Sequence, residues 1–239
     1  MATLETLKHR CSVQWQVYVT HPLFKDIGLG TFKPESMKFW LTQDLLYVAV
    51  YKRVREGLVD RVLAEPRLAP LHEKVAAPEW SSGSGEEEID IEDALLELLG
   101  GESPKDDSGL GPARDAYINH IARIFWEGSI CEVVAAILPC GAGFYEANAP
   151  FDPGRAGLPE FSRRWLEFFQ TTPTLAVSTE LLARSAELPG VPGLETLVRV
   201  FRRSLEHQID VLDAAWRADD PWPSEKHEAE RFGSLLQGT

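Results

Sequence analysis

Residues 113–148 read ARDAYINHIARIFWEGSICEVVAAILPCGAGFYEAN, and this stretch decides the fold. Before Gly128, apolar residues recur every three or four positions, as expected of a helix with one buried face. Gly128 interrupts the pattern, and Ser129 with Glu132 forms a capping-box motif that starts a second helix. Two helices joined by so short a turn lie antiparallel. The sequence therefore predicts a helical hairpin.

The predicted hairpin brings Tyr117 and Cys140 level with each other. Tyr117 precedes Gly128 by eleven residues, and Cys140 follows it by twelve. A free cysteine is usually a small buried apolar residue. It becomes a nucleophile where a positive neighbour, a helix N-terminus or a base favours the thiolate. The local sequence contains none of these, so Cys140 is either a packing residue or a nucleophile whose base comes from elsewhere in the fold.

Helical periodicity continues on both sides of the hairpin, whereas no internal repeat and no strand pattern longer than a few residues is present. The pattern predicts a loop over 21–34 and a short helical stretch in the C-terminal tail. Further helices are predicted at about 4–18, 34–63, 159–170, 174–188 and 194–216. We therefore expect an all-α fold, with residues 1–239 forming a single domain.

Asp44 lies in the middle of an otherwise apolar stripe on the predicted helix 34–63. Burying a carboxylate costs several kcal/mol unless it is paired or hydrogen-bonded. Tyr47 is three residues further on, on the same helix face, where its hydroxyl can donate a hydrogen bond. Asp44 is therefore either paired within the scaffold or used to recognise a ligand, and the second interpretation is favoured.

The segment at about 78–111 differs in composition from the rest of the chain. It contains Ser-Ser-Gly-Ser-Gly at 81–85 and the acidic run at 86–88, and Gly, Asp and Ser dominate 100–111. Only 91–99 forms a short amphipathic piece. This composition predicts an exposed insertion between core helices. Its acidic residues are expected to be solvated surface charge, and docking of a partner is the alternative.

The overall composition limits the partners and the location. The formal net charge of −13 repels nucleic-acid phosphates and anionic membranes, so neither partner is expected. Cys11, Cys131 and Cys140 are widely spaced and odd in number, which favours a reducing compartment over a disulfide framework. No stretch is expected to provide the ~18 apolar residues that span a bilayer. The cytoplasm is the expected location.

The sequence also lacks the usual patterns of metal and cofactor sites. None of the six histidines lies one turn from another on a predicted helix, and no Glu-x-x-His pair is present. Neither a glycine-rich phosphate loop nor a serine-nucleophile motif occurs. No metal and no cofactor are therefore expected.

Two runs of sequence resemble the signatures of the TenA (thiaminase II, aminopyrimidine aminohydrolase) family. The first is His21-Pro22, Ile27-Gly28-x-Gly30-Thr31 and Gln43-Asp44-x-x-Tyr47, and the second is Tyr117, Glu127-Gly128, Ala135-Ala-Ile-Leu-Pro-Cys140 and Tyr145-Glu146. The resemblance covers about 10–60 and 112–216. It implies a haem-oxygenase-like multi-helix bundle without haem, assembled as a homo-oligomer.

The resemblance also implies an activity. TenA enzymes hydrolyse thiamin or its aminopyrimidine breakdown products and release hydroxymethylpyrimidine for salvage. By position, Asp44 would accept hydrogen bonds from the ring nitrogen and amine of the pyrimidine. Cys140 would attack the pyrimidine carbon that carries the leaving group. Tyr47 and Tyr117 would orient the ring and the thiol.

Other positions depart from the family pattern. Phe144 and Phe169 stand where tyrosine is usual, which removes two hydroxyls. The last-helix glutamate expected to donate a proton aligns with Gln208, or with Glu206 after a local register shift. Glutamine cannot act as a general acid near neutrality. A non-hydrolytic pyrimidine-binding or regulatory protein is therefore an alternative to the hydrolase, and a haem-oxygenase-like di-iron oxidase has less support for want of metal-ligand spacing.

Overall fold

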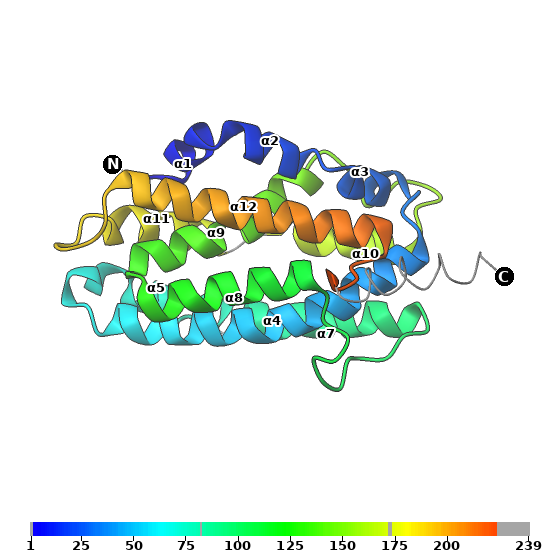
Figure 1. Cartoon of the computed structure of the whole chain (residues 1–239), viewed down its shortest axis with the longest axis horizontal. Helices are drawn as coiled ribbons and strands as arrows, with labels where there is room; N and C mark the ends of the chain where they lie inside the picture. The colour runs from blue at the N-terminus through cyan, green and yellow to red at the C-terminus, as the bar shows by residue number, and fades with distance from the viewer. Residues whose placement is uncertain (1, 82, 172–173, 224–239) are drawn as a thin grey trace, which may run out of the picture.

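The computed structural model describes residues 2–81, 83–171 and 174–223, and the fold in these ranges is helical without a strand (Figure 1). One 3₁₀ segment, η1 (Pro66–Leu71), joins the α-helices. The helices are α1 (Leu4–Arg10), α2 (Ser12–Val19), α3 (Pro22–Leu29), α4 (Pro34–Leu63), α5 (His72–Ala76), α6 (Pro78–Ser81), α7 (Gly83–Leu98), α8 (Pro112–Glu127), α9 (Ile130–Asn148), α10 (Glu160–Phe169), α11 (Leu175–Ser185) and α12 (Leu194–Arg217). The all-α prediction is confirmed.

Helices α8 and α9 form the predicted hairpin. The Glu132 carboxylate accepts a 2.8 Å hydrogen bond from the Ser129 N–H, which completes the capping box at the start of α9. At the end of α8, Arg61 of α4 donates to the carbonyl oxygens of Phe125 and Gly128, at 2.9 and 2.6 Å. Helix C-termini leave such carbonyls unsatisfied. Arg61 therefore ties the hairpin turn to α4.

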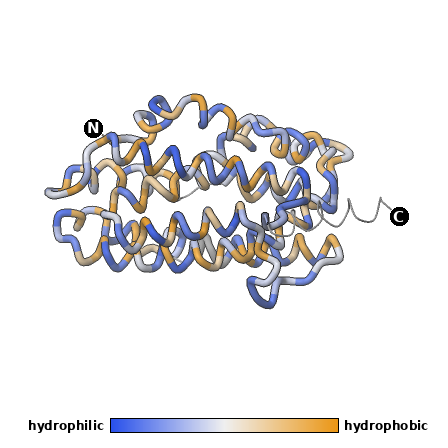
Figure 2. The backbone as a smooth tube through the Cα atoms, in the orientation of Figure 1, coloured by the Kyte–Doolittle hydropathy of each residue, from blue (hydrophilic) through white to orange (hydrophobic). Residues whose placement is uncertain are grey.

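Helix α9 is the central core helix, in contact with α2, α8, α11 and α12. Because neighbours cover it on several sides, it is apolar almost all round. Its 19 residues are long and apolar enough to cross a membrane by composition, so the expectation that no such stretch exists is wrong. Of an 18-residue stretch of this helix, 67% is buried, as is usual for the core helix of a folded protein. Figure 2 shows the hydrophobic positions recurring along the packed helices.

The N-terminal region contains more helix breaks than predicted. The chain bends at Cys11, which separates α1 from α2, and α3 occupies most of the predicted loop over 21–34. His21 caps α3 by accepting from the Leu23 N–H, and Gly30 ends it with a φ of 73°. Helix α3 has only eight residues, which is too short for a clear helical periodicity in the sequence. A further short helical stretch is predicted in the C-terminal tail, and residues 224–239 of this tail lie outside the described residues.

The prediction of an exposed insertion over 78–111 is wrong for α7. This helix packs along α4 (Figure 1), and its Leu95 and Leu96 side chains are each 1% exposed. Most of 101–110 is exposed, as expected. That loop is held by Gln43 of α4, whose amide donates to the Gly109 carbonyl and accepts from the Gly111 N–H. The Gly/Ser/Glu composition concealed a core helix.

We predict that Leu95→Ala lowers the free energy of unfolding by about 2–5 kcal/mol, because it leaves a cavity between α7 and α4. Leu98→Ala, on the same helix at a side chain that is 49% exposed, is the matched control and should change it by less than about 1 kcal/mol. Urea unfolding followed by circular dichroism measures both values. Equal effects of the two substitutions would contradict the packing of α7.

Candidate active site

A buried ion pair joins α4 to α8 at the centre of the bundle. The Arg114 Nη1 atom lies 2.6 Å from Asp44 Oδ1, and both side chains are about 95% buried or more. The guanidinium also lies over two rings, 4.8 Å from the centroid of Trp40 and 5.0 Å from that of Tyr47. Arg114 Nε and Nη2 have no hydrogen-bond partner among the described residues. Asp44 is thus paired, and two of the three guanidinium nitrogens of Arg114 make no hydrogen bond to the described residues.

Cys140 lies on α9 beside this pair and is partly exposed. Burial raises the pKa of its thiol, and the negative charges of Glu88 and Asp44 raise the pKa further. The Tyr47 hydroxyl and the Arg114 charge act in the opposite direction and do not offset the rise. Cys140 is therefore a neutral thiol in the structure, although Asp44 and Tyr47 are its neighbours as the resemblance implies.

Tyr47 and Tyr117 lie together between α4 and α8. Their rings stack with centroids 5.0 Å apart and planes 17° apart, and their hydroxyl oxygens are 3.5 Å apart. Burial raises the pKa of each phenol above its usual value, and the neighbouring Cys140 raises the pKa of both further. The hairpin geometry that places Tyr117 level with Cys140 is consistent with this proximity.

The last helix presents Gln208, not Glu206, to this group. Gln208 is 1% exposed and adjoins the Tyr117 hydroxyl. Its amide has no well-formed hydrogen bond to the residues that the structure describes. Glu206 is 43% exposed, 3.7 Å from Arg203, and lines a separate surface cleft of about 420 Å³. Of the two candidate positions, Gln208 is therefore the one beside Tyr117, and Glu206 lies at the surface.

Phe144 and Phe169 belong to an aromatic group next to the ion pair. Their ring centroids are 4.8 Å apart, and Phe144 also contacts Trp40, the ring over which the Arg114 guanidinium lies. Phe144 is buried, whereas Phe169 is partly exposed. Neither phenylalanine can donate a hydrogen bond, so this side of the group is apolar.

Two acidic residues of α7 complete the group, and sequence reasoning missed both. Glu88 and Glu92 each place a carboxylate oxygen so that these two and one of Asp44 all lie within 4.8 Å of one another. Glu92 is 1% exposed, and Glu88 is half-buried. Burial and the nearby Asp44 charge raise the pKa of Glu92 well above its usual range and that of Glu88 to about 8.

These three carboxyl groups are oxygen ligands of the kind that bind a hard divalent cation. The expectation of no metal site was based on histidine spacing, which does not test carboxylates contributed by two helices. Arg114 already supplies a positive charge to Asp44.

The missed residues had a weak signal in the sequence. Arg114 stands three residues before Tyr117, and Glu88 and Glu92 are one turn apart on the face that also carries Leu95. Charged residues at core-facing helical positions indicate a pairing. That indication depends on identifying α7 as a core helix.

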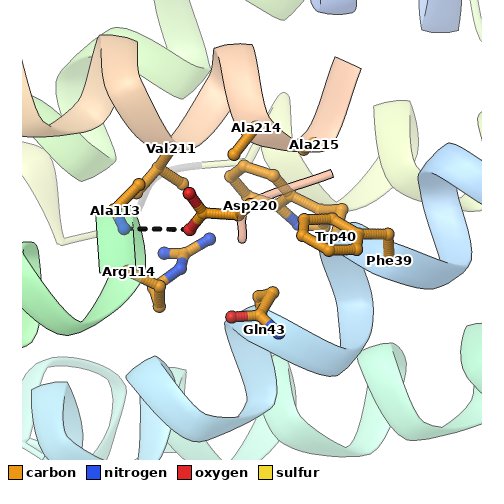
Figure 3. Close-up of a pocket in the computed structure, with 9 residues that line it drawn as sticks. All are labelled: Phe39, Trp40, Gln43, Ala113, Arg114, Val211, Ala214, Ala215 and Asp220. Atoms are coloured by element: carbon orange, nitrogen blue, oxygen red, sulfur yellow. Dashed lines mark hydrogen bonds between the residues drawn. The ribbon is translucent and has the colours of Figure 1, made fainter. Parts of the chain in front are cut away.

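A small space lies beside Arg114 (Figure 3). It has a volume of about 10 Å³ and is bordered by Arg114, Gln43 and Asp220. The Asp220 carboxylate accepts a 2.9 Å hydrogen bond from the Ala113 N–H at the start of α8, where an anion is favoured. The space is large enough for about one water molecule and too small for a pyrimidine ring.

The sequence is similar to proteins of thiamin metabolism, although no family model matches it. It is 24% identical over 173 residues to an aminopyrimidine aminohydrolase of Halalkalibacterium halodurans, covering 71% of this chain and 74% of that protein. It is 25% identical over 144 residues to the aminopyrimidine aminohydrolase of Bacillus subtilis, covering 59% and 58%. A hydroxymethylpyrimidine/phosphomethylpyrimidine kinase of Saccharomyces cerevisiae is 25% identical over 84% of this chain, which spans only 36% of that longer protein.

The fold matches solved TenA structures. A TenA homologue from P. horikoshii OT3 superposes with a TM-score of 0.69 at 20% identity, covering 89% of this chain and 97% of that one. A TenA homologue from Pyrococcus furiosus gives 0.68 at 18% identity, covering 88% and 98%. The haem-oxygenase-like helical bundle is thereby confirmed, and with the sequence similarities so is the resemblance to the TenA family.

We predict that Cys140 reacts slowly with iodoacetamide at pH 7, because its thiol pKa lies above the usual value of about 8.5. Asp44→Asn removes a negative charge that raises this pKa. At a given pH the variant should therefore contain more thiolate and react faster. Mass spectrometry of the Cys140 peptide across pH measures the rate. An unchanged pH profile would contradict the proximity of Asp44.

Proposed function

We propose that this TenA-like chain is a cysteine-dependent hydrolase of thiamin or its aminopyrimidine breakdown products, releasing hydroxymethylpyrimidine for salvage. One observation carries the proposal. Asp44, fixed by Arg114, and the partly exposed Cys140 come from different helices and lie in one group. The similarity to two bacterial aminopyrimidine aminohydrolases supports it.

Asp44 recognises the pyrimidine in this proposal. The amine and an adjacent protonated ring nitrogen of an aminopyrimidine present two N–H donors on one flat edge, and a carboxylate can accept one with each oxygen. Arg114 holds one oxygen of Asp44 and so fixes the plane of the carboxylate. The rings of Phe144 and Phe169 provide an apolar wall against which a pyrimidine can stack.

Cys140 is the nucleophile, and substrate binding activates it. Burial, and then the neighbouring Glu88 and Asp44, raise the pKa of the thiol and favour its neutral form. Thiamin carries a cationic thiazolium, and an aminomethylpyrimidine carries an ammonium group near neutral pH. A positive charge within a few ångströms favours the thiolate and lowers its pKa. In this proposal the hydroxyls of Tyr47 and Tyr117, 3.5 Å apart, orient the thiol and the ring.

A non-hydrolytic pyrimidine-binding or regulatory protein is the second candidate. It is favoured by Gln208 at the position expected for the acid and by the raised thiol pKa of Cys140. A haem-oxygenase-like di-iron oxidase has less support. The cluster of three acidic residues found among the described residues, Asp44, Glu88 and Glu92, includes no histidine. Cytoplasmic location, homo-oligomeric assembly and the lack of nucleic-acid and membrane partners remain predictions.

We predict that Cys140→Ala abolishes hydrolysis of thiamin and 4-amino-5-aminomethyl-2-methylpyrimidine while the protein stays folded. Cys131→Ala, at a fully buried cysteine on the same helix, is the control for losing a thiol and should keep most of the activity. Product formation followed by chromatography, with circular dichroism for folding, measures both. Equal activity of Cys140→Ala and wild type would show that another residue is the nucleophile. Pyrimidine binding without hydrolysis in wild type would support the binding protein.

A further inference from the structure

The surface cleft that contains Glu206 lies between α8 and α12, which pack against each other, and has a volume of about 420 Å³. Sites for small molecules usually measure about 300–1,000 Å³, so the cleft has room for such a ligand. Its lining includes four arginines: Arg123 on α8, and Arg199, Arg202 and Arg203 on α12. The chain as a whole has a formal net charge of −13, so this group of cations contrasts with the rest of the molecule.

Helical spacing places the charged residues of the cleft on two facing stripes. Residues three, four and seven positions apart lie on one face of a helix. On α12 this spacing relates Arg199, Arg202, Arg203 and Glu206, and on α8 it relates His120, Arg123 and Glu127. Because α8 packs against α12, the two stripes form opposite walls of the cleft, and cations stand on both walls.

The arginines of the cleft have no close carboxylate partners. A Glu127 oxygen lies 3.8 Å from Arg123, and both side chains are more than half exposed. A Glu206 oxygen lies 3.7 Å from Arg203. These separations exceed those of a hydrogen bond, and exposed ion pairs of this kind contribute little. The other two arginines have no carboxylate partner among the residues that the structure describes.

The remaining acidic residue of the lining, Glu132, is engaged elsewhere. Its carboxylate accepts hydrogen bonds of 2.8 and 2.7 Å from the N–H and the hydroxyl of Ser129 in the capping box. Arg163 on α10 shows what a neutralised surface arginine looks like in this chain. It donates to Glu160 at 2.5 Å and to Glu167 at 2.8 Å. The guanidinium groups of the cleft thus keep donors that an anion can use.

The positive charge reaches the floor of the cleft. His120 lines the cleft and is 6% exposed, and its Nε2 atom lies 2.9 Å from the Ser204 hydroxyl oxygen. Burial, and then the charges of His207, Arg123 and Arg203, lower the pKa of its imidazole to about 4. Arginines from both walls therefore act on the same point, where a bound anion is stabilised.

We propose that this cleft binds a small molecule that carries phosphate groups. The planar guanidinium group presents its N–H donors in a fork that matches phosphate oxygens, and arginines on opposite walls can contact one ligand together. A long polyanion such as a nucleic acid extends beyond the cleft onto the acidic surface, which repels it, whereas a compact anion does not. The proposal is independent of the hydrolase activity, because it involves neither Asp44 nor Cys140.

Calorimetric titration of the full chain with inorganic phosphate and inorganic pyrophosphate tests the proposal. Wild type should bind one pyrophosphate, more tightly than phosphate, because the larger anion can accept more charge-assisted hydrogen bonds. Arg123→Gln and Arg203→Gln each remove a cation from one wall and should weaken pyrophosphate binding at least about tenfold. Arg163→Gln changes the net charge equally outside the cleft, so this control should match wild type.

Nuclear magnetic resonance shows where the anion binds. Pyrophosphate should shift the ring signals of His120 on the cleft floor. The ring signals of His21 should not move, because His21 contacts Asp213 near the other end of α12. Hydroxymethylpyrimidine should not compete with pyrophosphate, whether or not it binds at Asp44.

Four outcomes would overturn the proposal. The first is the absence of binding of both anions at millimolar concentration. The second is equal weakening by Arg163→Gln and Arg123→Gln, which would assign the attraction to net charge. The third is displacement of pyrophosphate by hydroxymethylpyrimidine, which would place the anion in the candidate active site. The fourth is a single-stranded oligonucleotide that binds more tightly than pyrophosphate and loses affinity in Arg203→Gln, which would assign the cleft to nucleic acid.

Discussion

The buried ion pair between Asp44 and Arg114 is the constraint on which the centre of the molecule depends. It fixes α4 against α8, and the stacked pair Tyr47 and Tyr117 extends from the same two helices. Burying two charges costs several kcal/mol, which their attraction often does not fully repay. A hydrophobic pair would hold the helices as well, so the proposed function explains the ion pair by what Asp44 binds.

The sequence predicts those features that depend on local patterns. The hairpin follows from Gly128 and the capping box of Ser129 and Glu132, and the buried position of Asp44 follows from its place in an apolar stripe. What it does not reveal depends on contacts between distant segments. Arg114 becomes significant only once it meets Asp44, and Glu88 only once α7 packs on α4. Local composition suggested a loop there because Gly and Ser obscure a helix whose stability comes from tertiary packing.

The charge of the site suggests how binding and chemistry are linked. Three carboxyl groups lie within 4.8 Å of one another, and Arg114 pairs with one of them. Burial and the neighbouring Glu88 and Asp44 raise the pKa of the Cys140 thiol. A substrate with a positively charged leaving group would lower that pKa when it binds. On the proposed function, Cys140 is therefore more reactive with substrate bound than without it.

The central claim is that one pyrimidine contacts both Asp44 and Cys140. A crystal structure with bound hydroxymethylpyrimidine, the product of the proposed reaction, tests it most directly. We predict that the amine and ring nitrogen lie within hydrogen-bond distance of Asp44, with the hydroxymethyl group directed toward Cys140. A ring bound away from Asp44, or one with its hydroxymethyl group directed away from Cys140, would contradict the claim.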